Sequence, residues 1–234
     1  MVDILATLYC EILRLNPENP DWEERDRFIL SKGHGALSYY SALMLRGFIS
    51  EETFATFQLN ASDLTTHPVL NMTMGIESSN GSLGQGLSLG VGVAIAGQLR
   101  SKSYKVYVML GDGECNEGSV WEAAMSAANF KLDNLIAIVD KNDFQNDGSS
   151  SEVMDPGDFV KKWNSFGWNA ILVDGHDIFA VHSALSSQNI EGRPKALIAK
   201  TIKGKGCSFM ENKAEWHHNR LTKALYEMAI QELD

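Results

Sequence analysis

Continuous apolar runs with polar residues at both ends predict strands that are buried on both faces of a parallel sheet. The two clearest runs are Lys105 to Leu110 and Leu135 to Val139, and two more are Asn169 to Val173 and Ala196 to Lys200. A shorter apolar run, Arg27 to Leu30, breaks at a Ser-Lys-Gly-His-Gly sequence. The runs therefore predict an open, mostly parallel central sheet.

Apolar residues at helical spacing fill the stretches between these runs. They predict helices over Ile4 to Leu15, Ala36 to Arg46, Ser82 to Leu99, Val120 to Phe130, Ile178 to Leu185 and Leu221 to Leu233, and another that begins at Ser50. Asp3 and Ser50 are placed to cap two of them. Because strands and helices alternate, we expect an α/β fold with helices flanking the sheet, in one domain over residues 1–234, and ligands at the carboxyl ends of the strands.

Glycine is unusually frequent in the helix predicted from Ser82 to Leu99. The glycines in question are Gly84, Gly86, Gly90, Gly92 and Gly97. Each glycine inside a helix costs ~1 kcal/mol relative to alanine. We therefore expect close backbone packing along this helix, either within the domain or against a second subunit.

Composition and charge exclude several classes of protein. The formal net charge is −10 and the basic residues are scattered, which argues against a nucleic-acid groove. No run approaches the ~18 apolar residues that a membrane span needs, and the first residues lack a secretory-signal pattern. The cysteines are three and far apart, which disfavours a disulfide framework or a zinc site. We expect a cytoplasmic protein with free, buried thiols.

Candidate ligand-binding residues follow the ends of two consecutive predicted strands. The first strand is followed by a Gly-Asp-Gly sequence that contains Asp112 and Gly113, and the second is followed by Asn142. Glycines let the backbone approach a bulky anion, and a helix that begins after them directs free N–H groups at it. The 28 residues between Gly113 and Asn142 suffice for one helix and one strand. Both tips then return to the same sheet edge, where oxygen ligands can hold a diphosphate through Mg²⁺.

At this point the sequence resembles the thiamin-diphosphate family, and specifically the N-terminal half of transketolase, over nearly its whole length. Five segments occur in the family's order: Asp26 to Gly35, Gly81 to Gly86, the Gly-Asp-Gly to Asn142 element, Gly175 to Asp177, and Lys200 to Gly206. The chain looks most like the small-chain version, in which one enzyme is divided between two polypeptides. The resemblance implies the thiamin-diphosphate-binding fold.

The resemblance also implies a cation site. Asp112, Asn142 and the backbone carbonyl of Phe144 would bind Mg²⁺, with Ca²⁺ or Mn²⁺ as alternatives. Gly113 and Asn142 would also contact the diphosphate of thiamin diphosphate.

Further residues are implied to contact the cofactor itself. His34 would donate to a diphosphate oxygen, and Gly81, Ser82 and Leu83 would lie along the cofactor. The Leu83 side chain would face the aminopyrimidine ring, whose amino group would donate to the Gly81 carbonyl.

Three residues are implied to take part in catalysis. His67 would face the substrate hydroxyls, and His217 would reach both the diphosphate and the substrate, with the adjacent His218 as the alternative. Glu117 would lie at the subunit boundary near the partner's catalytic glutamate, where close carboxylates share protons.

The implied reaction transfers a two-carbon ketol unit from a ketose or ketose phosphate to an aldehyde acceptor. The cofactor breaks the carbon–carbon bond, and the protein supplies orientation and electrostatics. The glutamate that protonates the aminopyrimidine belongs to the other half of the enzyme. We therefore expect this chain to be inactive alone and to work with a C-terminal partner chain, as an α₂β₂ assembly that acts on small sugar substrates.

The sequence departs from the family pattern in three places. Family members usually carry a Gly-His-Pro segment before the helix that starts here at Asp3, and this sequence starts after that point. Either the polypeptide is shortened or its donor site lacks one imidazole. Asp143 stands where many relatives have glycine, and Asn146 is more polar than usual. Asp tolerates left-handed backbone, so the loop can keep its path, while the added carboxylate would alter the metal affinity.

Other functions remain open from the sequence. One is a thiamin-diphosphate enzyme with a 2-oxoacid donor, which His67 and His217 disfavour because they suit polyhydroxylated donors. Another is a non-catalytic scaffold subunit of such a complex. A dinucleotide-binding oxidoreductase is disfavoured because no Gly-x-Gly-x-x-Gly follows a strand with an acid at the end of the next strand.

Overall fold

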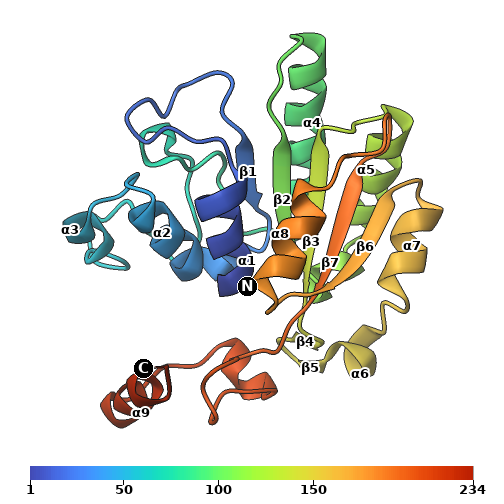
Figure 1. The fold of residues 1–234 in the computed structure, drawn as a ribbon. Helices are drawn as coiled ribbons and strands as arrows, with labels where there is room; N and C mark the ends of the chain where they lie inside the picture. Colours follow the sequence, from blue (N-terminus) through green and yellow to red (C-terminus); the bar gives the residue numbers. More distant parts are fainter. Residues whose placement is uncertain (234) are drawn as a thin grey trace.

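A sheet of five parallel strands forms the centre of the protein (Figure 1). The computed structural model describes residues 1–233, so the last residue of the predicted domain lies outside the described residues. The strands, in spatial order, are β1 (Arg27–Leu30), β2 (Val106–Gly111), β3 (Leu135–Lys141), β7 (Lys195–Lys200) and β6 (Asn169–Asp174). The prediction of an open parallel sheet is confirmed.

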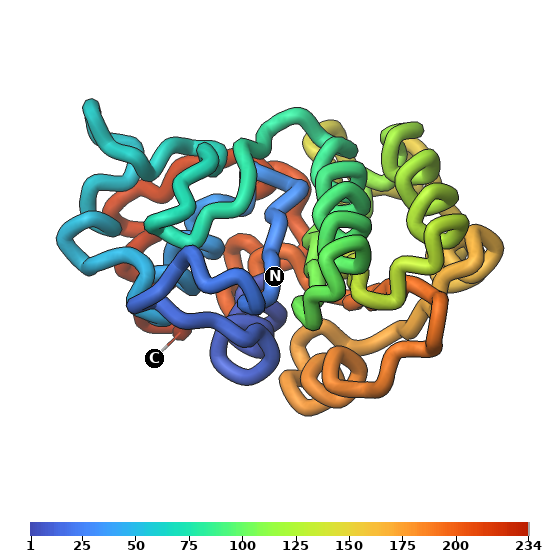
Figure 2. Tube along the Cα trace, turned by 90° about the horizontal axis from the view of Figure 1, so that it is seen from above, coloured from blue at the N-terminus to red at the C-terminus, as the bar shows by residue number. Residues whose placement is uncertain are grey.

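Helices cover both faces of this sheet, which explains why its strands read as continuous apolar runs. One face packs against α1 (Val2–Thr7), α2 (Ala36–Leu45) and α8 (Ile178–Ser186), and the other against α4 (Gln85–Leu99), α5 (Gly118–Asn129) and α7 (Phe159–Ser165). Along β2, Tyr107 and Met109 belong to the first core and Val108 and Leu110 to the second. Figure 2 shows α4 and α5 side by side on their face of the sheet.

The glycines of α4 allow this helix to approach the sheet closely. A side chain at Gly86 would collide with Ser31, one at Gly90 would lie 2.5 Å from Val108 Cγ2, and one at Gly97 would lie 2.9 Å from the Tyr104 ring. Close packing within the domain is thus confirmed for these three positions. Gly92 is different, since apart from its chain neighbours and the backbone of its own helix no atom of residues 1–233 lies within 4 Å of the position its Cβ would take. The start predicted at Ser82 is wrong, because the residue before Gln85 is Gly84, whose left-handed φ of +81° is not helical.

The first helix differs from its prediction in length and in its cap. It runs as α1 and then as a π-helix over Leu8–Ile12, so it ends before Leu15. Asp3 lies inside α1 and does not cap it; its carboxylate instead contacts His176 Nδ1 at 2.8 Å. His176 Nε2 accepts a hydrogen bond from the Ile202 N–H at 2.8 Å, which fixes the tautomer and ties the segment after β7 to α1. The Ser50 cap is confirmed, because its side chain accepts from the Thr53 N–H.

Short elements lie near the carboxyl ends of the strands, the lower edge of the sheet in Figure 1. They include the hairpin of β4 (Phe144–Gln145) and β5 (Gly148–Ser149), α6 (Ser150–Met154), and 3₁₀ turns over Gly33–Gly35, Gly113–Asn116 and Ala214–His217. Elsewhere the chain forms α3 (Glu51–Phe54), a 3₁₀ turn over Met72–Met74, and α9 (Lys223–Leu233).

None of the helices in residues 1–233 has the length and apolar content to cross a bilayer. Cys115 and Cys207 are buried as expected, whereas Cys10 is exposed.

Candidate functional site

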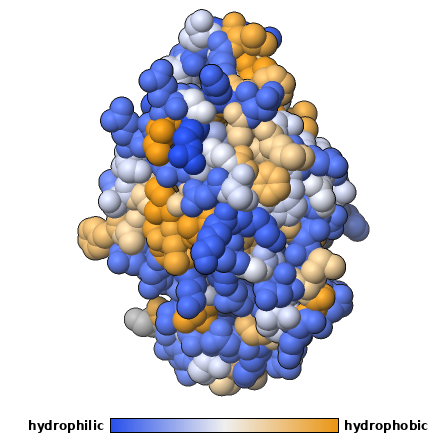
Figure 3. Space-filling model, turned by 90° about the vertical axis from the view of Figure 1, so that its right-hand side faces the viewer, coloured by the Kyte–Doolittle hydropathy of each residue, from blue (hydrophilic) through white to orange (hydrophobic). Residues whose placement is uncertain are grey.

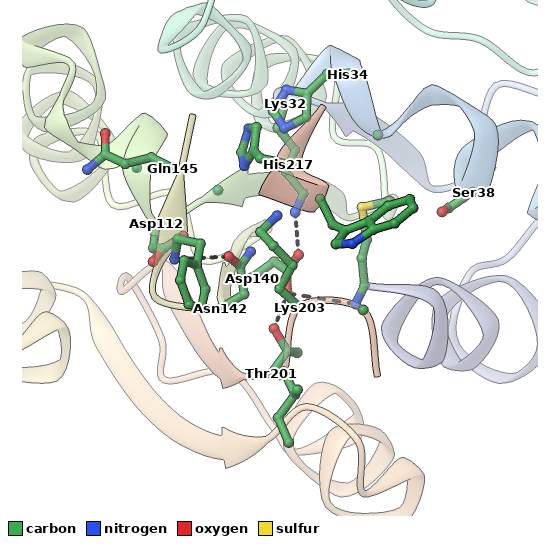
Figure 4. Close-up of a pocket in the computed structure, with 18 of the residues that line it drawn as sticks. Lys32, His34, Ser38, Asp112, Asp140, Asn142, Gln145, Thr201, Lys203 and His217 are labelled. Carbon is green, nitrogen blue, oxygen red and sulfur yellow. Dashed lines mark hydrogen bonds and ion pairs between the residues drawn. The ribbon is translucent and has the colours of Figure 1, made fainter. Parts of the chain in front are cut away.

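A cavity of about 920 Å³ opens at the carboxyl ends of the strands. Its walls come from the ends of β1, β2, β3 and β7 and from the segment that precedes α9. Figure 4 shows His34 and His217 on one side of this cavity and Asp112 and Asn142 on another. This is the place at which a parallel α/β sheet binds ligands, because the loops that leave consecutive strands meet there.

Asp112 follows β2 directly and is 1% exposed. Two donors orient its carboxylate, since the Asp143 N–H (2.9 Å) and the Ser150 hydroxyl (3.0 Å) both bond to Oδ2. Burial raises the pKa of Asp112, and the Ser150 hydrogen bond and the Lys32 charge oppose that rise. The result is a buried carboxylate whose ionised form gains from a nearby cation.

Asn142 and Phe144 lie beside this carboxylate, on the turn after β3. The Asn142 side-chain oxygen accepts from the Phe144 N–H at 3.1 Å, which directs the amide into the turn. Asp143 between them has a φ of +63°, the left-handed backbone expected for the residue that replaces glycine. The Asp143 carboxylate forms an ion pair with Lys141, the last residue of β3. The positive charge of Lys141 therefore compensates the additional negative charge of Asp143.

His34 and His217 bring two imidazoles together from opposite ends of the sequence, with ring centroids 5.3 Å apart. Desolvation lowers the pKa of His34 to about 4, helped by the charges of Lys32 and His217. Desolvation likewise lowers the pKa of His217 to about 4, helped by the charges of Lys203 and Lys32. Both rings are therefore neutral at pH 7. The structure places His217 on the cavity wall, whereas His218 is exposed and is not among the lining residues.

Two lysines bring positive charge to the same wall. Lys32 is 6% exposed and forms an ion pair with Asp140. Lys203 is half-buried, and its pKa is lowered by desolvation and by the charge of Lys32. Thr201 donates its hydroxyl to Asp140 Oδ1 at 2.6 Å, so Asp140 joins the ends of β1 and β7.

The structure brings most of the predicted site residues to this one cavity. The lining residues among them are His34, Leu83, Asp112, Gly113, Glu117, Asn142, Phe144 and His217. His67, Gly81 and Ser82 are exposed and lie outside the lining. They are nevertheless neighbours of it, because a Cβ on Gly33 would lie 3.0 Å from His67 Cδ2 and one on Gly81 would lie 3.7 Å from the same atom.

Sequence reasoning missed Lys32, Lys203 and Asp140 as members of the site. Lys32 and Lys203 belong to sequence segments that carry the family resemblance, and a search of those segments for basic residues would have found them. Asp140 also lies in such a segment, two residues before Asn142, but nothing in the sequence indicates its partner. It reads as the polar end of a strand, and its partner Lys32 lies 108 residues away in the sequence.

The chemistry of the cavity fits an anionic group held with a cation. Two buried polar atoms on its walls, Gln145 Nε2 and His217 Nδ1, have no hydrogen-bond partner in residues 1–233. Gly113 lets Gln145 pack closely against the turn after β2, since a Cβ there would lie 2.8 Å from Gln145 Cβ. In the described part of the chain no three His, Cys, Asp or Glu side chains gather into a metal site. A cation beside Asp112 would therefore depend on amide, carbonyl and ligand oxygens as well.

Comparison with known proteins agrees with this geometry. Residues 1–232 match the family described as transketolase, thiamine diphosphate binding domain. The chain is 40% identical over 233 residues to the 6-deoxy-6-sulfo-D-fructose transketolase subunit SqwG of Clostridium sp. (strain MSTE9), covering 99% of this chain and 85% of that protein. It is 44% identical to an apulose-4-phosphate transketolase subunit of Actinobacillus succinogenes, covering 99% of this chain and 84% of that protein.

A solved structure extends the similarity to the fold. The transketolase of Campylobacter jejuni superimposes with a TM-score of 0.91 at 30% identity, over 98% of this chain and 37% of that longer one. The relatives of similar length are subunits, and the longer relatives contain the same region as one part of a whole enzyme. This chain therefore belongs to the transketolase family, as an N-terminal, thiamin-diphosphate-binding subunit of a transketolase divided between two chains.

Proposed function

We propose that this subunit, together with a C-terminal partner chain, transfers a two-carbon ketol unit from a ketose with an anionic end group to an aldehyde acceptor. The observation that carries the proposal is the meeting of Asp112 and Asn142, from two adjacent strand ends, opposite His34 and His217 in one cavity. Such a cavity offers a cation site on one wall and neutral hydrogen-bonding groups on the other.

The cation in this proposal is Mg²⁺. It would be held by the Asp112 carboxylate, the Asn142 side-chain oxygen and the Phe144 carbonyl, which are the hard oxygen ligands that Mg²⁺ prefers. Because the Asp112 Oδ2 oxygen already accepts two hydrogen bonds, the Oδ1 oxygen is the one assigned to the cation. A single carboxylate leaves the cation with net positive charge, which suits a diphosphate as the remaining ligand.

The diphosphate would lie between this cation and the basic wall. Gly113 and Lys203 both line the cavity, and Lys203 supplies a positive charge. His34 and His217, neutral at pH 7, would each donate one ring N–H. When bound, thiamin diphosphate supplies the nucleophilic carbon and the electron sink for cleavage of a bond next to a carbonyl. The residues of this chain bind and orient the reactants around it.

The donor class is inferred from the relatives and from the polar groups at the cavity mouth. The two subunits of similar length are named for a sulfonated fructose and for apulose 4-phosphate, which are sugars with an anionic end. His67 would face the donor hydroxyls, beside Gly33 and Gly81. A 2-oxoacid has no such row of hydroxyls for a histidine to recognise.

The partner in this proposal supplies the catalytic glutamate, and Glu117 lies beside it at the boundary between the chains. Glu117 is exposed at the start of α5 and lines the cavity, so a carboxylate from another chain can reach it. Large apolar side chains that remain exposed, such as Leu89, Leu99 and Met125, offer surface for such an assembly. Figure 3 shows apolar patches between hydrophilic residues on one face of the molecule. We assign the assembly an α₂β₂ stoichiometry and a cytoplasmic location, which suits three unpaired cysteines.

The test is reconstitution of the chain with a C-terminal transketolase chain encoded in the same genome. Ketol transfer is expected from ketose phosphates or sulfonated ketoses only when both chains, thiamin diphosphate and Mg²⁺ are present. Asp112→Asn should abolish the metal-dependent activity, while the exposed control Asp63→Asn should retain it. Turnover by the isolated chain, or preference for pyruvate over every ketose, would contradict the proposal. An assembly that binds no cofactor would support the scaffold alternative.

A further inference from the structure

Glu114 is a buried carboxylate that connects three separate segments around the cavity. It is 3% exposed. Its Oε1 oxygen accepts from the Ser31 hydroxyl and from the Gly84 N–H at 2.9 Å, and its Oε2 oxygen accepts from the Gly111 N–H at 3.0 Å. The three donors lie on the end of β1, on the loop before α4 and on the end of β2.

Each of these segments carries part of the proposed site. Ser31 is followed by the turn that holds His34, Gly84 ends the loop that contains Leu83, and Gly111 directly precedes Asp112. Eighty-three residues separate Glu114 from Ser31 in sequence, and 30 separate it from Gly84. One side chain therefore fixes the distances between parts of the site that the backbone alone does not connect.

The contacts around Glu114 extend into a small network. The Ser31 hydroxyl oxygen also accepts from the Gly86 N–H at 3.2 Å, so the first turn of α4 is held at the same point. Ser119 donates to the Gly84 carbonyl at 3.0 Å and holds the loop from the other side. Gly84 itself has a φ of +81°, a conformation that no helix hydrogen bond enforces. The loop thus keeps its path through polar contacts to Glu114 and Ser119.

A carboxylate is the group that this position requires. Both of its oxygens accept an N–H bond, whereas the amide of glutamine offers one acceptor oxygen and directs an NH₂ group at the other donor. A buried N–H that loses its acceptor is costly, so the loop would move away in order to regain a partner.

We propose that Glu114 is a positioning residue that holds the 81–84 loop and the Asp112 turn at their mutual distance, so that both contact one bound thiamin diphosphate. Glu114 itself acts through these segments and not on the ligand. The cofactor part of this inference rests on the proposed function, while the effect on the loop can be measured without any ligand.

The test compares Glu114→Gln with wild type and with Glu191→Gln, an exposed glutamate on the loop before β7. Hydrogen exchange of the whole chain is followed in the peptides covering residues 81–87 and 135–141, since exchange reports local opening. For Glu114→Gln we expect at least tenfold faster exchange in 81–87, unchanged exchange in 135–141, and about tenfold weaker binding of thiamin diphosphate with Mg²⁺. A residue with a merely structural role would accelerate exchange in both peptides equally, and that result overturns the inference.

Ser31→Ala is the second variant, which tests the network even if Glu114→Gln does not fold. It removes the Ser31 donor to the carboxylate and the acceptor of the Gly86 N–H, and it leaves the carboxylate with its bonds to Gly84 and Gly111. A smaller increase of exchange, a few-fold and confined to 81–87, is therefore expected. Unchanged exchange in 81–87 in either folded variant would overturn the inference. Failure of the wild-type chain to bind thiamin diphosphate would instead contradict the proposed function, and the exchange of the 81–87 peptide would still decide the role of Glu114.

Discussion

The Lys32 ammonium and the Asp140 carboxylate form an ion pair on the wall of the cavity, between the ends of β1 and β3. Both side chains are buried, at 6% and 3% exposure. Burial alone would raise the pKa of Asp140, but the charges of Lys32 and of the Met1 amino group, together with the hydrogen bonds from Lys32 and Thr201, outweigh it and hold that pKa well below its usual range. Lys32 lies two residues before His34, and Asp140 lies two residues before Asn142. The pair therefore holds the two walls of the site together.

Asp140→Asn is expected to destabilise the chain strongly. It leaves the Lys32 ammonium buried without a counter-charge, and removal of one partner from a buried pair costs ~3–5 kcal/mol. The free energy of unfolding in urea measures the effect. Lys32→Met combined with Asp140→Asn should recover part of the loss, because no charge is then buried. The exposed control Asp63→Asn should stay within ~0.5 kcal/mol of wild type, and an Asp140→Asn protein as stable as this control would contradict the role assigned to the pair.

Asp112→Asn, in contrast to Asp140→Asn, should lower the affinity for the cation without lowering the free energy of unfolding of the metal-free chain. Burial raises the pKa of Asp112, so its negative charge is unfavourable in the metal-free chain. The asparagine oxygen can still accept from the Asp143 N–H and Ser150. We expect metal-free unfolding within ~1 kcal/mol of wild type or slightly more stable, a frequent trade-off at functional sites.

Calorimetric titration with Mg²⁺ and thiamin diphosphate measures the functional side of this change. Loss of a residue that only hydrogen-bonds to a metal ligand typically lowers metal affinity ~10–100-fold. Asp112 is itself a proposed ligand, so the affinity should fall by at least that factor. Undiminished affinity in Asp112→Asn would show that the cation is held elsewhere, and the proposed site would then be wrong.

Much of the fold could be predicted because the sheet is buried on both faces. The observed strands β2 and β3 differ from the predicted runs by one or two residues, since an uninterrupted apolar run has clear ends. The meeting of Asp112 and Asn142 at one sheet edge could be predicted for the same reason. Both follow directly on consecutive parallel strands, and the carboxyl ends of such strands share an edge.

Other features left no local signal in the sequence. The apolar residues of the π-helical turn over Leu8–Ile12 also suit the spacing of an α-helix, so hydrophobic periodicity could not distinguish the two kinds of helix. The pairing of Lys32 with Asp140 and the contacts of Glu114 join residues that are far apart in the sequence. Such polar contacts depend on tertiary packing, and neither the type of a residue nor its immediate neighbours indicates its partner.

Gly84 and Gly92 form a matched pair for testing the packing of α4. Gly84→Ala should cost more than ~2 kcal/mol, because left-handed backbone alone costs ~1–2 kcal/mol and the added Cβ would collide with Ser119 and lie 2.7 Å from Glu117 Cβ. Gly92→Ala should stabilise the isolated chain by up to ~1 kcal/mol, because it has open space and lies inside a helix. Thermal or urea unfolding of the chain without its partner measures both, and equal effects of the two variants would contradict the close packing of the start of α4 against the start of α5.

The low pKa of His217 predicts how the stability of the chain changes in mild acid. Its pKa is about 4 in the folded chain and ~6.5 in an unfolded one. Between these values the unfolded chain binds a proton that the folded chain does not, so this residue makes the folded state less stable as pH falls from about 6.5 to 4. Buried acids with raised pKa, such as Glu114 and Glu77, act with the opposite sign, so the total slope is not diagnostic.

The diagnostic quantity is therefore the difference between variants. Between pH 7 and pH 4.5 the free energy of unfolding should fall less for His217→Gln than for wild type, because the ring that resists protonation is gone. Above pH 7 the free energy of unfolding should change with pH in the same way in both proteins. His218→Gln, which removes the exposed neighbouring ring, is the matched control. The free energy of unfolding at several pH values measures all three. Parallel pH profiles for wild type and His217→Gln would mean that His217 is solvated in the folded chain, which contradicts its place on the cavity wall beside His34.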